Sequence, residues 1–177
     1  AANYKEALEQ SKYVMALSYE VLKNTTKANE LYRELIKENT KKPDVYIKIF
    51  AANQAEKQTD KAINVLKRGV KNLPDNAQLK ALLGSTYLQA GQKEEAEKIV
   101  QSLLALGEKK EVFNYVGDIY RDASDIAKAE EYYNKSLALD AAQTDAYFGL
   151  ASTYFNKAVD VLKEADKVPL DDMTGAY

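Results

Sequence analysis

Apolar residues recur along most of the chain at spacings of three and four residues, which is the period of a helix with one buried face. Short polar or glycine-containing segments interrupt this pattern at 23–26, 57–60, 90–93 and 122–125. Such segments are typical of tight turns between helices. Ala, Leu, Lys and Glu dominate the composition, and these residues favour helices over strands. The sequence therefore predicts an all-α chain of helical hairpins.

The hairpins repeat with a nearly constant period. One alanine in each second helix, at positions 28, 62, 96 and 129, gives spacings of 34, 34 and 33 residues. Nine positions before this alanine, three hairpins have a tyrosine, at 19, 87 and 120, and the second hairpin has Asn53. Thirteen positions before the alanine, every hairpin has a large apolar residue: Met15, Ile49, Leu83 or Val116. A fixed period of this length indicates stacked copies of one unit.

This pattern resembles the tetratricopeptide repeat, whose consensus has Leu-Gly and then Tyr in the first helix, and an alanine and an aromatic residue in the second. The closest matches are Leu83-Gly84 with Tyr87 and Val116-Gly117 with Tyr120. The resemblance covers four repeats, at about 9–42, 43–76, 77–109 and 110–143, and a fifth opens at 144. It implies a right-handed superhelical array of antiparallel helix hairpins in a single domain over 1–177. We also expect a fragment of a longer bacterial repeat protein. The sequence does not determine its compartment, although the Lys-, Asn- and Tyr-rich composition leans toward an exported protein.

Small residues mark where the two helices of a hairpin cross, because helices approach closely only where side chains are small. The register places Ala16, Gly84 and Gly117 of first helices against the alanines of second helices. Phe50 replaces the small residue in the second hairpin, and Asn53 replaces its tyrosine. The second hairpin is therefore the one that departs most from the consensus.

The two ends of the array differ from its middle. The apolar rhythm predicts a first helix from near Asn3 to about Leu22, and one long last helix from about Asp145 to about Lys167. A tail over 168–177 follows. The last helix should expose Phe155, Val159 and Leu162, since no further hairpin covers them. This predicts weak head-to-tail self-association through the terminal helices.

The composition excludes much catalytic chemistry. Cys and His are absent, which removes disulfides, thiol or imidazole nucleophile pairs and the common zinc sites. Nucleotide-binding and acyl-transfer motifs are not found, and the glycines fall at crossings and turns. The acidic residues Glu111, Asp118, Asp122 and Asp125 are interpreted as solvated surface rather than a metal site. We therefore expect no enzyme activity, no cofactor and no metal.

The resemblance implies a binding groove lined by the first helix of each repeat. Carried over position by position, its residues are Tyr13, Leu17, Val21, Ile47, Gln54, Ser85, Leu88, Asn114, Asp118, Arg121, Asp122 and Phe148. The first half of this groove is apolar and neutral, and the later half is acidic. Such a groove would complement a peptide or protein segment with apolar anchors and a basic end. The sequence thus favours a non-catalytic protein-interaction scaffold.

Two other functions remain open at this point, together with one purely structural role for the groove. A surface protein that binds a glycan or another ligand could use the same repeat, and so could a reader of single-stranded RNA. The charge balance of 25 basic and 27 acidic residues, a net charge of −2, argues against a nucleic-acid partner. The groove could also pack only against further helices of a longer parent chain.

Overall fold

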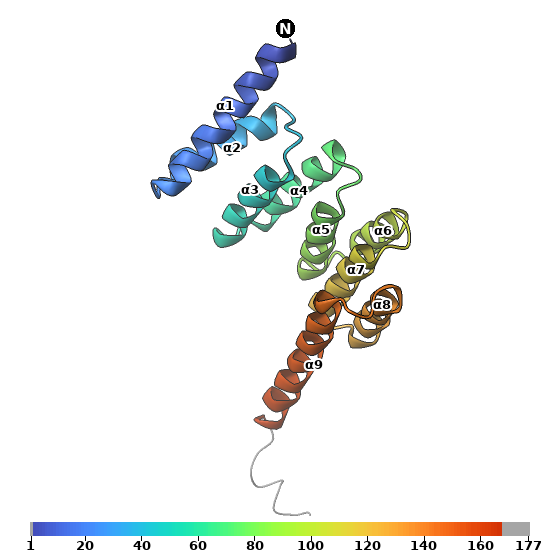
Figure 1. The fold of residues 1–177 in the computed structure, drawn as a ribbon. Coiled ribbons are helices and arrows are strands. Elements are labelled where there is room, and N and C mark those ends of the chain that lie inside the picture. Colours follow the sequence, from blue (N-terminus) through green and yellow to red (C-terminus); the bar gives the residue numbers. More distant parts are fainter. Residues whose placement is uncertain (1, 168–177) are drawn as a thin grey trace, which may run out of the picture. The chain divides into compact units, whose positions relative to one another are not determined.

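The computed structural model describes residues 2–167, and within them it contains nine helices and no strand (Figure 1). The helices are α1 (Ala2–Val21), α2 (Thr25–Lys37), α3 (Pro43–Ala55), α4 (Thr59–Asn72), α5 (Ala77–Gln89), α6 (Lys93–Leu104), α7 (Lys110–Asp122), α8 (Ile126–Leu139) and α9 (Thr144–Ala165). The predicted all-α helical repeat is confirmed. None of the helices over 2–167 combines the length and the apolar character that crossing a membrane requires.

The described residues fall into two compact units. The first covers Ala1–Ser102 and the second begins at Leu103, so the division lies inside α6. The first unit holds α1 to α5 with most of α6, and the second holds α7, α8 and α9. The single domain over 1–177 stays a prediction.

Each hairpin turn is closed in the same way. The residue after the turn donates its backbone N–H to the carbonyl of the residue five positions earlier, and these carbonyls belong to Tyr19, Asn53, Tyr87 and Tyr120. Between them, one residue of each turn takes a left-handed conformation: Lys23, Lys57, Gly91 or Ser124. Glycine is the residue that adopts this conformation without steric cost, and only the third hairpin has it there. The repeat register thus places equivalent backbone atoms in equivalent positions.

The core of the first unit lies between the two helices of each hairpin and the hairpin that follows. Ala16 and Ala28 are both buried, which agrees with the close crossing of α1 and α2 that the sequence predicts. Tyr46 of α3 is fully buried, and its hydroxyl donates to the backbone oxygen of Thr40 at 2.9 Å. The side-chain amide of Asn72 donates to the same hydroxyl at 2.7 Å. The buried phenol is therefore satisfied by α4 and by the preceding loop.

The second unit is organised around Tyr133 of α8. A Cβ built on Gly117 would lie 2.7 Å from the Tyr133 ring, and one built on Gly149 would lie 2.3 Å from it. The ring therefore occupies the space that both glycines leave open. The sequence predicts that Gly117 faces Ala129, which is buried, and the atoms nearest to a Cβ at Gly117 belong to the Tyr133 ring. Tyr133 lies one turn further along α8, and its ring takes the space at the crossing.

The terminal helices agree closely with the predicted bounds. α9 leaves Phe155 68% exposed and Leu162 65% exposed, as predicted, whereas Val159 is half-buried. On α1, Tyr4 is 75% exposed and Met15 is 49% exposed. The residues equivalent to Met15 are buried in the later hairpins, each of which follows another hairpin. Within residues 2–167 no hairpin precedes α1, so none covers Met15. The tail predicted over 168–177 lies outside the described residues.

Candidate functional site

In the first unit, two polar contacts join the first helices of the first two hairpins. The hydroxyl of Tyr13 donates to the Asp44 carboxylate, and the ammonium of Lys48 lies 2.8 Å from both carboxylate oxygens of Glu20. Leu17 lies between Tyr13 and Glu20 along α1, so its side chain is on the face that meets α3. Leu17 is half-buried. This face of α1 and α3 is therefore a pre-ordered surface with an apolar centre.

The charges on this surface are paired. The hydrogen bond to Asp44, together with burial, raises the pKa of Tyr13 to about 12. The ammonium of Lys42 lies 4.7 Å from the centre of the Tyr13 ring, within the range of a cation–π contact. The sequence predicts an apolar, neutral front, whereas the structure has two polar cross-links there, with carboxylates and ammonium groups side by side. The neutrality comes from pairing and not from a lack of charged residues.

The other predicted residues of the first unit come from three helices. Val21 is 83% exposed at the end of α1. The remaining four are half-buried, two on α3 and two on α5: Ile47, Gln54, Ser85 and Leu88. Ile47 and Leu88 both pack against the buried core of the unit, so each presents only part of its side chain to a partner.

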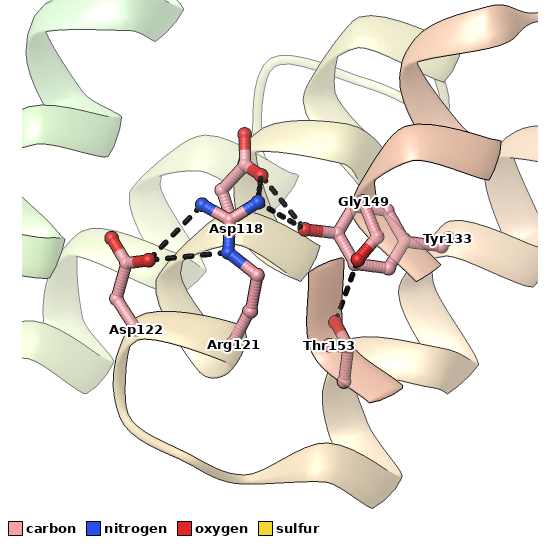
Figure 2. A network of polar contacts seen from close by, with 6 residues as sticks. All are labelled: Asp118, Arg121, Asp122, Tyr133, Gly149 and Thr153. Carbon is pink, nitrogen blue, oxygen red and sulfur yellow. Dashed lines mark hydrogen bonds and ion pairs between the residues drawn. The ribbon is translucent and has the colours of Figure 1, made fainter. Parts of the chain in front are cut away.

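In the second unit, Arg121 lies between two carboxylates (Figure 2). Its Nη1 is 2.6 Å from Asp118 Oδ1, and its Nη2 is 3.0 Å from Asp122 Oδ1. The hydroxyl of Tyr133 donates to the same Asp118 oxygen at 2.7 Å. On α9, the Thr153 hydroxyl donates to the backbone oxygen of Gly149 at 2.8 Å. Three predicted groove residues are thus brought together, and Tyr133 ties them to the core.

This network changes the interpretation of the acidic half. Burial is the main cause that raises the pKa of Asp118, and it also raises the pKa of Tyr133. The sequence predicts a solvated carboxylate at Asp118, and this is wrong, because the side chain is half-buried and bonded to Tyr133 and Arg121. Asp118, Arg121 and Asp122 together carry one net negative charge rather than two.

The last two predicted residues differ from each other. Asn114 is only 8% exposed and its Oδ1 has no hydrogen-bond partner, so it presents little surface, and its place in the groove stays a prediction. Phe148 on α9 is 73% exposed and available for contact. Over residues 2–167, the structure contains no group of three acidic, His or Cys side chains that could hold a metal ion.

The sequence reasoning missed two residues that shape these surfaces. Lys48 follows a predicted groove residue and was not assigned to the groove, although Glu20 has the opposite charge and the repeat register brings α1 and α3 together. Tyr133 is not among the predicted groove residues. A glycine in the middle of a first helix, Gly149, is the feature of the sequence that could have indicated the position of the Tyr133 ring, because the ring fills the space that the glycine leaves.

Comparison with protein-family models gives two matches, both described as tetratricopeptide repeat. One model matches residues 22–84 and 53–114, and the other matches residues 112–143. Together they cover more than half of the chain and all of the turns described above. The chain belongs to the tetratricopeptide repeat family.

A curated relative of this repeat protein is protein IFIT1 homolog B of Homo sapiens, which is 31% identical over 87 residues. The matched segment is 49% of this chain but only 18% of that protein. The chain thus spans less than a fifth of the length of the curated relative it matches.

Solved structures agree on the fold at low sequence identity. A MamA protein is 20% identical, with 89% of each chain covered and a TM-score of 0.57. PilF of Pseudomonas aeruginosa is 20% identical, with 88% of this chain and 72% of that chain covered and a TM-score of 0.58. BtubC from P. vanneervenii is 20% identical, with 97% and 82% covered and a TM-score of 0.57. At these identities the likeness shows the helical-repeat fold alone.

Proposed function

We propose that this tetratricopeptide repeat chain is a non-catalytic scaffold that binds a peptide or protein segment on the first-helix faces of its hairpins. The fold supports an interaction role, because stacked hairpins present long, rigid surfaces to a partner. Within the first unit, the observation that carries the proposal is the α1–α3 face. Two polar contacts, Tyr13–Asp44 and Lys48–Glu20, hold its helices in place around the half-buried Leu17. The face is therefore ordered before binding, which lowers the conformational entropy cost of binding a partner.

The partner should combine apolar anchors with a basic group. Leu17, Ile47 and Leu88 offer partly exposed apolar contacts in the first unit. In the second unit, Asp122 and the exposed Glu111 offer negative charge, since Arg121 neutralises only part of it. Apolar contacts would supply most of the affinity, and the carboxylates would mainly speed association at low salt.

The experiment starts from peptides selected by display on the full chain. Isothermal titration calorimetry with one selected peptide then compares the native chain with Leu17→Asp. We expect the substitution to weaken binding by about 1–3 kcal/mol, because it removes an apolar contact and places a charge at its centre. Circular dichroism of the variant controls for folding.

A matched control is Met15→Asp. It introduces the same charge on the same helix, at another side chain that is accessible to solvent. Met15 is two residues from Leu17 and therefore lies on the opposite side of α1. Binding should be unaffected by this variant. Equal losses in both variants, or no loss in Leu17→Asp, would show that the selected peptide binds elsewhere.

A further inference from the structure

The second hairpin lacks a ring that the other three possess. Tyr87 and Tyr120, at the equivalent position of the third and fourth hairpins, are each 7% exposed, and Tyr19 is half-buried in the first. In all four hairpins, the backbone oxygen of this residue accepts the hydrogen bond that closes the turn. The second hairpin therefore has an equivalent backbone with Asn53 in place of the ring.

The surroundings of the ring in the first and fourth hairpins show what a ring in the second would touch, whereas the third hairpin has Glu95 at the lysine position. The ammonium of Lys27 lies 5.3 Å from the centre of the Tyr19 ring, and that of Lys128 lies 4.6 Å from the centre of the Tyr120 ring. Lys61 is the equivalent residue of the second hairpin, because in each case the lysine comes eight positions after the ring. The second hairpin therefore keeps the lysine and lacks the aromatic residue beneath it.

A hollow of about 530 Å³ lies at this place, between α2, α3 and α4. Its volume is in the range of small-ligand pockets, about 300–1,000 Å³. Apolar side chains line part of it, among them Ile49 and Val65. In the fourth hairpin the residue equivalent to Val65 is Tyr132, whose ring stacks on Tyr120 with centroids 5.7 Å apart. The smaller valine and Asn53 together leave the hollow open.

The polar lining has a definite charge. Arg33, Lys37 and Lys61 border the hollow and Glu56 is the one carboxylate there, so the border carries two net positive charges. None of these three cations forms an ion pair within residues 2–167. They remain available to an acidic ligand.

Asn53 adds a polar side chain to the lining of the hollow. As a residue it is only 2% exposed, and its side-chain amide borders the hollow. The side chain offers both a donor and an acceptor to a group that enters the hollow.

We propose that the hollow binds a tyrosine or phenylalanine side chain of another protein segment in which acidic residues flank the aromatic one. The ring takes the place of the missing tyrosine beneath Lys61, the flanking carboxylates pair with Arg33 and Lys37, and Asn53 bonds a phenol hydroxyl or a backbone group of the segment. The residues that line this site, on α2, α3 and α4, differ from those of the α1–α3 face proposed above. The chain would then have two separate binding surfaces.

The test uses NMR of the full chain and short peptides as probes. Acetyl-Asp-Tyr-Asp-amide should give saturable shifts of the Asn53 side-chain amide and of the Val65 methyl groups. Acetyl-Asp-Ala-Asp-amide should bind at least tenfold more weakly, and acetyl-Lys-Tyr-Lys-amide likewise. Equal binding of the alanine peptide, or no saturable shift with the tyrosine peptide, overturns the proposal. The proposal is also overturned if adenosine monophosphate binds tightly and the tyrosine peptide does not bind, because that result would indicate a nucleotide site.

Two variants locate the probe. Asn53→Tyr restores the residue that the other hairpins have and fills the hollow, so binding of the tyrosine peptide should fall at least tenfold. Arg33→Gln with Lys61→Gln changes two exposed side chains and leaves the core intact, and it should weaken binding at least fivefold at low salt. Leu17→Asp should have no effect, which separates this site from the proposed scaffold surface. Undiminished binding in both hollow variants overturns the proposal.

Discussion

Replacing Gly149 by alanine should destabilise the second unit, although alanine is the better helix former. The new Cβ would lie 2.3 Å from the Tyr133 ring, where ordinary contacts begin at 3.4 Å, so the ring or α9 must move by roughly 1 Å. The ring is held between Gly117 and Gly149, and its hydroxyl is bonded to Asp118 at 2.7 Å. A shift of this size therefore strains the hydrogen bond as well as the packing.

The expected magnitude follows from three contributions. Overpacking costs about 1–3 kcal/mol. Weakening a hydrogen bond to a charged group adds part of the about 1.5–3 kcal/mol that such a bond contributes. The gain in helix propensity offsets about 1 kcal/mol. The free energy of unfolding should thus fall by about 2 kcal/mol.

Urea unfolding of the full chain, followed by circular dichroism, measures this change, and hydrogen exchange of α7, α8 and α9 amides assigns it to the second unit. Ala151→Gly, an exposed position on the same helix, calibrates the propensity contribution alone. In a Tyr133→Phe background, Gly149→Ala should cost less, because the hydroxyl bond is already lost. If Gly149→Ala leaves stability equal or raises it by about 1 kcal/mol, propensity alone acts and the tight contact with the ring is refuted.

Three further predictions concern pH and association. Burial raises the folded pKa of Asp118 above its usual 3.8, so its contribution to stability is full at low pH and is lost as pH rises through the raised value. Relative to Asp118→Asn, the native chain should therefore lose unfolding free energy as the pH rises above 3.8, and a gain in urea titrations would contradict this. The pKa of Tyr13, about 12, should fall in Asp44→Asn, as NMR of the labelled ring can measure, and an unchanged midpoint would exclude the hydrogen bond as its main cause. The exposed apolar side chains of α9, Phe155 and Leu162, should make the chain self-associate, so the mass measured by light scattering should rise with protein concentration. Phe155→Glu with Leu162→Glu should abolish this rise. A native chain that stays monomeric at high concentration would show that these side chains do not drive association.

The repeat register could be read from the sequence because it depends on local residue types. Tyrosines and alanines at fixed spacing, with polar segments between them, determine where helices begin, turn and pair. The turns after Tyr19, Tyr87 and Tyr120 were predicted in this way, and so was the turn after Asn53. These features need no knowledge of which side chains meet across helices.

The candidate binding surfaces could be predicted only in part, because they depend on contacts between side chains of different helices. Asp118 is internally bonded since Tyr133 reaches it through space left by Gly149, a residue 31 positions further along the sequence. Glu20 and Lys48 are 28 residues apart, and their pairing requires the relative rotation of α1 and α3. The sequence showed that Asn53 replaces a tyrosine, but only the structure shows that nothing else fills the space.

Methyl NMR of the full chain with a display-selected peptide tests the scaffold proposal most directly. If the first-helix faces bind the partner, the largest shifts on saturation should appear at the methyl groups of Leu17, Ile47 and Leu88. Leu31 and Val65, which belong to second helices, should change little. Shifts concentrated on the second helices, with Leu17 and Ile47 unperturbed, would contradict the account.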